Sequence, residues 1–443
     1  MARVGRLGNV CLKKETTWGT YIAGDVKLRP TSESLARKVE HVEDAALVGE
    51  LYTTKMVKVA DGASGGIETS CHGDTAGIFL HSALGGEAAV SDPVNARVIF
   101  AYTGASIYHR VTVSSVAAVL SEVSTNGSSW TTETGFCTAG TLNGSSMTFT
   151  AITAAINTST GGYHAVLLGD GTQVGADIPA QAATLTKSNS VLFGAEVLKS
   201  AESAATTAKT HTLSPADATA SLPSYSITVN RALGTNASLG YTGSKISSLV
   251  LNCAAKDLVK MSLTWDCEAE EIDQTDIVLT TPTITAFTAS NTRMVLVKAD
   301  SSDMDEFDEV KNLSLTINTN VDDNRVVGSV YKKEQTRQGS TIELSFEANN
   351  TTTQYGYRSQ YTADSAVECF IYIEGVDECD AATDVKYNIM IHIPQLKLTD
   401  YNSTLSTADR LTISAAGTAE KPSSTVNTKH LYAYVTDADT TTY

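Results

Sequence analysis

Two stretches, Asn312-Leu-Ser-Leu-Thr-Ile-Asn318 and Thr341-Ile-Glu-Leu-Ser-Phe-Glu347, alternate apolar and polar side chains at every second position. Successive side chains of a β-strand point to opposite faces of the sheet, so the apolar residues of each stretch share one face. A strand with one dry and one wet face is typical of antiparallel sheets. These stretches therefore predict an antiparallel β-protein.

The same alternation recurs along most of the chain, for example at residues 260–266 and 410–414. Helical periodicity is rare. The best helix candidates are residues 74–84, where Asp74 stands at the start of an apolar stripe, and residues 151–156. The sequence predicts a mainly β fold with few short helices.

An internal repeat organises the chain. Two segments of the chain share an acidic pair, an apolar pair, a glycine and a tyrosine in the same order, without a gap. They are Val42-Glu-Asp-Ala-Ala-Leu-Val-Gly-Glu-Leu-Tyr52 and Val321-Asp-Asp-Asn-Arg-Val-Val-Gly-Ser-Val-Tyr331. Each copy continues through a basic stretch to a glycine-led strand, a short helix and a closing antiparallel pair. These elements are predicted at 66–70, 74–84, 246–253 and 260–267 in the first copy, and at 340–347, 352–360, 387–398 and 411–416 in the second. Matching elements in matching order indicate a duplication.

The repeat predicts two tandem domains with an insertion in the first. We expect domain 1 at residues 1–94 plus 206–272, an inserted domain at 95–205, domain 2 at 273–420, and a C-terminal arm at 421–443. The insert is rich in Ser, Thr, Ala and Gly but carries apolar strands, which favours a small surface domain; a flexible insertion without a core is the alternative. The N-terminal ten residues and the C-terminal arm lack alternation and are expected to order on contact with neighbouring subunits.

Composition limits the function classes. The 443 residues carry a net charge of −17, which disfavours tight nucleic-acid binding because phosphate affinity needs clustered Lys and Arg. The chain has no apolar run of signal-peptide or membrane-spanning length, so we expect synthesis in the cytoplasm and no membrane insertion. Seven scattered cysteines without a CxxC pair favour buried free thiols.

Candidate chemistry is weak throughout. Cys71 and His72 are adjacent, so on a strand they would point apart, and His392 is interpreted as an outward-facing strand residue. The acidic run 300–309 lacks the glycine and glutamate spacing of an EF-hand and is interpreted as a solvated loop, while the run 266–276 is interpreted as an inter-domain linker. A hydrolase using Glu270 or Glu271 is the weakest alternative. We predict no catalytic, cofactor or metal site.

Several segments together resemble the tail-tube (major tail) proteins of long-tailed bacteriophages. They are Glu15-Thr-Thr-Trp-Gly-Thr20, residues 28–34, 42–52 and 66–70, and a late hairpin with residues 249–251 and 261–265. The order of these elements carries the resemblance, which covers the chain outside the insert.

The resemblance implies a β-sandwich, or half-barrel, with a flanking helix. Long hairpins join those of neighbouring subunits into a ring-shaped β-barrel, and the rings stack into a tube that conducts DNA during ejection. Family rings generally contain six such domains, so a tandem repeat predicts a homotrimer with pseudo-sixfold symmetry; a homohexamer is the alternative. The implied partners are the tape measure, tail terminator and tail tip proteins and double-stranded DNA in transit. The alternative function is a virion surface decoration protein or adhesin that binds host carbohydrate.

Two sets of residues are candidates for sites. Alternation places Glu68, Glu343 and Glu347 on wet strand faces, and these are the lumen-facing candidates; the simpler alternative is that they face solvent or a neighbouring subunit. The candidates for contacts between rings or subunits are Glu43, Asp44, Asp322, Asp323, Asp303, Asp305 and Glu306.

Overall fold

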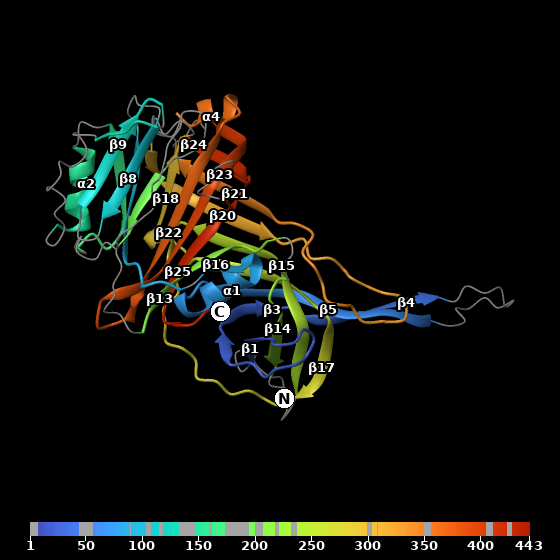
Figure 1. Ribbon diagram of the computed structural model, residues 1–443. Helices are drawn as coiled ribbons and strands as arrows, with labels where there is room; N and C mark the ends of the chain where they lie inside the picture. The colour runs from blue at the N-terminus through green and yellow to red at the C-terminus, as the bar shows by residue number, and fades with distance from the viewer. Residues whose placement is uncertain are drawn as a thin grey trace.

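The structure, a computed structural model, is mainly antiparallel β-sheet (Figure 1). It describes residues 8–443 except 44–55, 89, 103–107, 115–117, 127, 133–146, 159–161, 173–194, 200–206, 218–220, 232–236, 299–303, 308, 350–355, 405–410 and 423–427. The predicted mainly β fold class is confirmed.

One antiparallel ladder of eight strands runs through both repeats. Its order is β3–β5–β16–β15–β20–β21–β24–β23. The strands are β3 (Pro30–Glu33), continued by β4 (Ala36–Glu43), β5 (Met56–Ser70), β16 (Lys260–Cys267), β15 (Ser238–Ala254), β20 (Val310–Asn318), β21 (Thr341–Asn349), β24 (Thr412–Ala419) and β23 (Val385–Thr404). We call this set the ladder. The predicted strands of the opening stretches are β20 and β21, paired with each other.

The apolar face of the ladder packs against two further sheets around one core. One sheet joins the first half of β15 to β14 (Tyr225–Asn230), β1 (Asn9–Lys14), β2 (Val26–Leu28) and β17 (Ala269–Gln274). The other joins the first half of β23 to β22 (Ala366–Asp380), β18 (Thr292–Val297), β19 (Met304–Phe307) and β25 (Tyr432–Asp437). β13 (Lys209–Pro215) bridges β25 and β6 (Gly85–Glu87). The helical elements here are α1 (Gly73–Leu84), η3 (Ala289–Asn291) and α4 (Arg358–Thr362).

The predicted insert has a core of its own. β7 (Ala96–Tyr102) pairs with β11 (Tyr163–Gly169) and β12 (Ala195–Lys199), and α2 (Phe149–Asn157) packs on one face of this sheet. A second small sheet consists of β8 (Tyr108–Ser114), β9 (Ala118–Ser124) and β10 (Thr131–Thr132). The opposite face of β7 packs on β18, β22 and β23. The insert therefore packs on the outer face of the β18–β22–β23 sheet and not on the polar face of the ladder (Figure 1).

The two halves of the ladder repeat each other in pairing and in irregularities. Ser70 faces Lys260 in the first half, and Asn349 faces Thr412 in the second. A bulge interrupts β15 at Ser247 and β23 at Thr399. The offset between β5 and β21, 279 positions, is also the offset between Tyr52 and Tyr331 in the sequence repeat. β3 and β20 likewise carry bulges at Thr31 and Lys311. The ladder therefore contains the same four-stranded unit twice.

Two hairpin arms project together from the ladder. The first arm is β4 with the start of β5; the second is residues 319–340, whose two sides are joined by backbone hydrogen bonds such as Asp322 N–H to the Thr336 carbonyl (3.0 Å). The amide of Asp61 donates to the Val330 carbonyl (2.8 Å) and fixes the second arm against β5. Figure 1 shows both arms extending far from the body, on the side opposite the insert. Residues 44–52 of the first repeat motif lie outside the described residues.

The C-terminal segment differs from the expected arm. β25 lies between β13 and β23, and the side chains of Ala433 and Val435 are buried in the core. The Tyr443 ring stacks on His211 with ring centroids 4.2 Å apart. The prediction was wrong for residues 428–443, because alternation in a six-residue strand between polar stretches is too short to stand out.

Three smaller expectations change. The acidic run 266–276 is mostly strand β17 rather than a linker, and it pairs with β15, so the expected boundary at residue 272 falls inside a strand. In the run 300–309, residues 304–307 form β19 rather than a solvated loop. Of the helix expected at 352–360, only α4, which begins at Arg358, lies in the described residues.

Candidate functional site: the polar face of the ladder

The polar face of the ladder brings the three lumen-facing candidates together. Glu68 faces Ser262 across the β5–β16 pair, and Glu343 faces Thr316 across the β20–β21 pair. Val250 of β15 faces both Ser262 and Thr316, so Glu68 and Glu343 lie in one lateral row of the sheet. Glu347 lies two pleats further along β21, on the same face.

Glu68 and Glu347 occupy equivalent positions in the two four-stranded units. Each faces a serine of the following strand, Ser262 and Ser414 respectively. Each also accepts a hydrogen bond from the preceding strand, from the Ser32 hydroxyl (3.0 Å) and from the Asn312 side-chain amide (3.4 Å). The sequence predicted that both glutamates lie on polar strand faces, but only the strand pairing shows that the two positions are equivalent.

This polar face is open to solvent in the single chain. The side chains of Glu68, Glu343, Ser345 and Ser414 are exposed, whereas their sequence neighbours Ile67, Leu344 and Phe346 are buried. The face carries hydroxyl, amide and carboxylate groups and also the ammonium groups of Lys38 and Lys260. Such a surface is hydrated and carries negative charge, so it repels polyanions.

The expected contact residues fall into three groups. Glu43 is exposed at the outer end of β4, and Asp44 and Asp303 lie outside the described residues. The remaining four are in strands or in the second arm, namely Asp305, Glu306, Asp322 and Asp323. Their contacts with a neighbouring subunit stay a prediction.

Within the chain, several of these carboxylates hold local structure. Asp322 accepts hydrogen bonds from the Thr336 amide (2.6 Å) and hydroxyl (3.0 Å), which closes the base of the second arm. Asp323 pairs with Arg325 (2.9 Å) and Lys332 (3.2 Å). Glu306 pairs with Arg293 (2.6 Å).

A buried ion cluster at the base of the arms was not predicted. Asp61 is 1% exposed and is bound by the guanidinium of Arg37 (2.9 Å) and the ammonium of Lys58. The hydrogen bond from Arg37 holds the pKa of Asp61 well below its usual range, with Lys58 adding to the effect and burial opposing it. The partners come from β4 and β5, so the cluster joins the two strands of the first arm at its base. The sequence carried no signal beyond a lone Asp in a strand.

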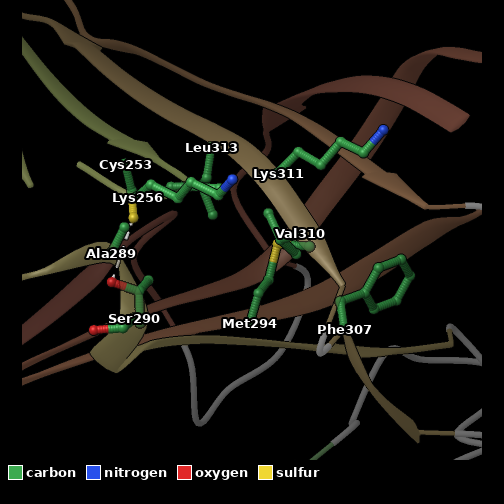
Figure 2. A pocket seen from close by; sticks show the side chains of 11 residues that line it. Cys253, Lys256, Ala289, Ser290, Met294, Phe307, Val310, Lys311 and Leu313 are labelled. Carbon is green, nitrogen blue, oxygen red and sulfur yellow. Dashed lines mark hydrogen bonds between the residues drawn. The ribbon is translucent and has the colours of Figure 1, made fainter.

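A pocket of about 340 Å³ lies where the β15–β20 pair ends (Figure 2). Figure 2 shows Cys253 at its edge, Lys256 reaching toward Leu313, and Lys311 pointing away from the apolar side chains of Met294 and Val310. Burial raises the pKa of the Cys253 thiol, so the reactive thiolate is disfavoured. The pocket offers space and apolar contact rather than an activated nucleophile.

The histidine interpretations have different outcomes. His72 precedes the first turn of α1, and its Nδ1 lies 2.7 Å from the Ser70 carbonyl oxygen, so it is a helix-terminal histidine. The interpretation of His392 as outward-facing was wrong. It is 6% exposed, stacks on Phe370 and lies 2.6 Å from Glu368, because the insert covers that face of the sheet.

The described part of the chain contains no metal-binding cluster of His, Cys, Asp and Glu side chains, and no helix there is long and apolar enough to span a bilayer. All six cysteines in that part are buried free thiols. No curated protein sequence matches the chain. The family model described as phage tail tube protein matches residues 5–371, including both arms, the insert and most of the ladder. With this match and its antiparallel β fold, the chain belongs to the phage tail tube protein family and is a structural subunit that self-assembles into the tube of the virion tail.

Proposed function

We propose that three copies of the chain form each ring of the tube and that the polar face of the ladder lines its lumen. The observation that carries this proposal is the ladder of eight strands made of two equivalent halves. If each four-stranded unit counts as one position, three chains supply six positions and a closed barrel of 24 strands. Closure removes the open edges that such a sheet otherwise exposes.

The lumen is suited to the passage of double-stranded DNA. Strands of a closed barrel tilt against its axis, so a lateral row of the sheet runs obliquely around the channel. Glu68 and Glu347 occupy equivalent positions in the two units, and a pseudo-sixfold ring therefore places six carboxylates at one level. Negative charge and hydrated side chains avoid phosphate binding, which would retard the duplex. The insert packs on the β18–β22–β23 sheet, away from the polar face, and therefore decorates the outside of the tube.

The tube works with other tail components. We propose the tape measure protein inside the forming tube, the terminator and tip proteins at its ends, and synthesis in the cytoplasm of the host bacterium. A purely structural role without enzymatic activity fits this assembly. Family membership does not favour the alternative of a surface adhesin.

Site-specific labelling tests the lumen assignment. Glu68→Cys and Glu347→Cys are each treated with a maleimide carrying a large polymer, before and after tube assembly. The unassembled subunit reacts because these positions lie on the open face. In tubes the polymer is excluded from the channel and labelling falls at least tenfold, whereas a small maleimide still reacts.

Ser128→Cys is the control, because Ser128 is exposed on the insert and stays on the outside. It is labelled by the large reagent in both states. Equal labelling of Glu68→Cys in subunits and tubes would place the polar face outside. If Glu68→Cys in tubes is protected from the small maleimide as well, the polar face lies in a contact between subunits.

A further inference from the structure

We propose that the seam between neighbouring copies in the ring repeats the seam inside the chain: β23 of one copy pairs with β3 and β4 of the next, with Asn402 opposite Ala36 and Asp400 opposite Lys38. The proposal rests on the proposed ring and specifies its interface residue by residue. The partner is a second copy of this chain.

The internal seam supplies the template. It is the β15–β20 pair, where Ser248 to Ala254 face Asn318 to Asn312 without interruption. It joins the last strand of the first four-stranded unit to the first strand of the second unit. The same two ends, β3–β4 and β23, remain at the outer edges of the ladder.

The equivalences fix the register. The bulges at Ser247 and Thr399 align β15 with β23, and those at Thr31 and Lys311 align β3 with β20. Val250 then corresponds to Asn402, and Thr316 corresponds to Ala36. Because Val250 faces Thr316 inside the chain, Asn402 faces Ala36 between chains.

Each of these two edge strands has a neighbouring strand on one side in the described part of the chain. Among the described residues, β4 pairs with β5 on one side, and β23 beyond Lys397 pairs with β24 on one side. Adding a strand to such an edge is a recurrent mode of protein association. Three chains joined this way close the ring without any free edge.

Side-chain chemistry agrees with this register. Asp400 and Lys38 are both exposed and of opposite charge, and an opposite-charge pair directly across two strands stabilises the sheet. Tyr401 and Arg37 become neighbours on the other face, where their counterparts Leu249 and Ile317 pair in the core. A guanidinium over a tyrosine ring is favourable.

The start of the seam is protected in the free subunit. The carbonyl of Leu35 accepts hydrogen bonds from the Tyr241 hydroxyl (3.0 Å) and from Arg231 (2.8 Å). Beside β3 lies a groove of about 580 Å³ lined by Pro30, Glu33 and Arg231 among others. Ring closure requires the incoming strand to displace Arg231, so these side chains satisfy the edge until a neighbour arrives.

Cysteine cross-linking tests the register in the full-length chain. Ala36→Cys with Asn402→Cys creates a pair that is not hydrogen-bonded between strands, with Cα atoms about 4.5 Å apart, within disulfide reach. Oxidised tubes of this variant, denatured without reductant, yield covalent trimers. Val250→Cys with Thr316→Cys is the matched control and forms the disulfide within one chain, leaving monomers.

Lys38→Cys with Asn402→Cys shifts the pair by two residues and is expected to cross-link at least tenfold less. The proposed register would be overturned if this variant cross-linked more strongly, or if the Ala36–Asn402 cross-link were absent from tubes that form normally. Either result would leave the proposed trimeric ring itself intact. Failure of the unmodified chain to form rings or tubes would instead contradict the proposed function itself.

Discussion

His211, in β13, links β13 to β6 and β25 through contacts with carboxylates. Its Nδ1 lies 2.8 Å from Glu87 of β6, and its Nε2 lies 3.3 Å from Asp437 of β25 and 3.0 Å from the Asp439 carbonyl oxygen. Burial opposes the charged form, but the hydrogen bonds and charges of Asp437 and Glu87 outweigh it and raise the pKa of His211 to about 9.

This raised pKa predicts a loss of stability at alkaline pH. A group whose pKa is higher in the folded state stabilises it fully below its unfolded value of about 6.5, and the contribution disappears as pH rises through 9. We expect the free energy of unfolding of the unassembled subunit to fall by about 3 kcal/mol over that window. Urea titrations from pH 6 to pH 10 measure it. In His211→Gln the fall is absent; an equal fall in that variant would assign it to other groups.

At this scale, alternation along single strands was sufficient to predict Glu68, Glu343 and Glu347 on polar faces. Alternation could not predict the ion pairs of Asp61 or His211. The partners of His211 are distant in sequence, and those of Asp61 do not stand out from other charged residues nearby. It failed for His392 because alternation distinguishes two faces but does not show that a distant segment, here the insert, covers the second one.

Among the elements, the arms carry an unusual share of exposed apolar side chains. Val42 faces Val57 across the first arm and the two are 55% and 44% exposed, while Val327 in the second arm is fully exposed. Exposed apolar clusters on a soluble subunit mark contact surfaces. We therefore expect the arms, which extend from one end of the strands, to contact another subunit.

Removing this apolar surface should impair assembly and leave folding intact. Val57→Ser with Val327→Ser is expected to change the free energy of unfolding by less than about 0.5 kcal/mol, since both side chains are already exposed. Tubes should be shorter and fewer in electron micrographs. Ile272→Ser, which removes a 61% exposed apolar side chain outside the arms, is the control. Normal tube lengths in the arm variant would show that the arms do not hold the tube together.

The insert is the second element with a testable role. Ser91 and Thr210 exchange backbone hydrogen bonds of 3.0 Å, so the chain enters and leaves the insert at one point. Replacing residues 95–205 by a short Gly/Ser linker should yield thinner tubes that still assemble. The deletion exposes Val295, Phe370 and Met390, so lower solubility is expected as well. Loss of assembly in protein that remains folded by circular dichroism would place the insert inside the contacts.

Strands with a long alternation of apolar and polar residues were predictable from the sequence. Strands that form because they pair with a segment distant in sequence were not. β20, β21, β16 and α1 stand where alternation or helical periodicity placed them. The acidic residues of β17 suggested a linker, because the pairing with β15 that makes them a strand is not visible in local sequence.

The whole molecule merges its two repeats into one continuous ladder. The offset of 279 positions was visible in the sequence as Val42–Tyr52 against Val321–Tyr331. The β15–β20 seam was not predictable, because strand pairing between repeats depends on three-dimensional closure rather than on periodicity. In the proposed ring, that seam would make one chain equivalent to two neighbouring positions.

The number of chains in each ring tests this equivalence most directly. Reconstruction of assembled tubes by cryo-electron microscopy should show three chains per ring, a 24-stranded inner barrel, and Glu68 alternating with Glu347 around the lumen. Six chains per ring, with each chain contributing only one of its four-stranded units to the inner barrel, would contradict the account.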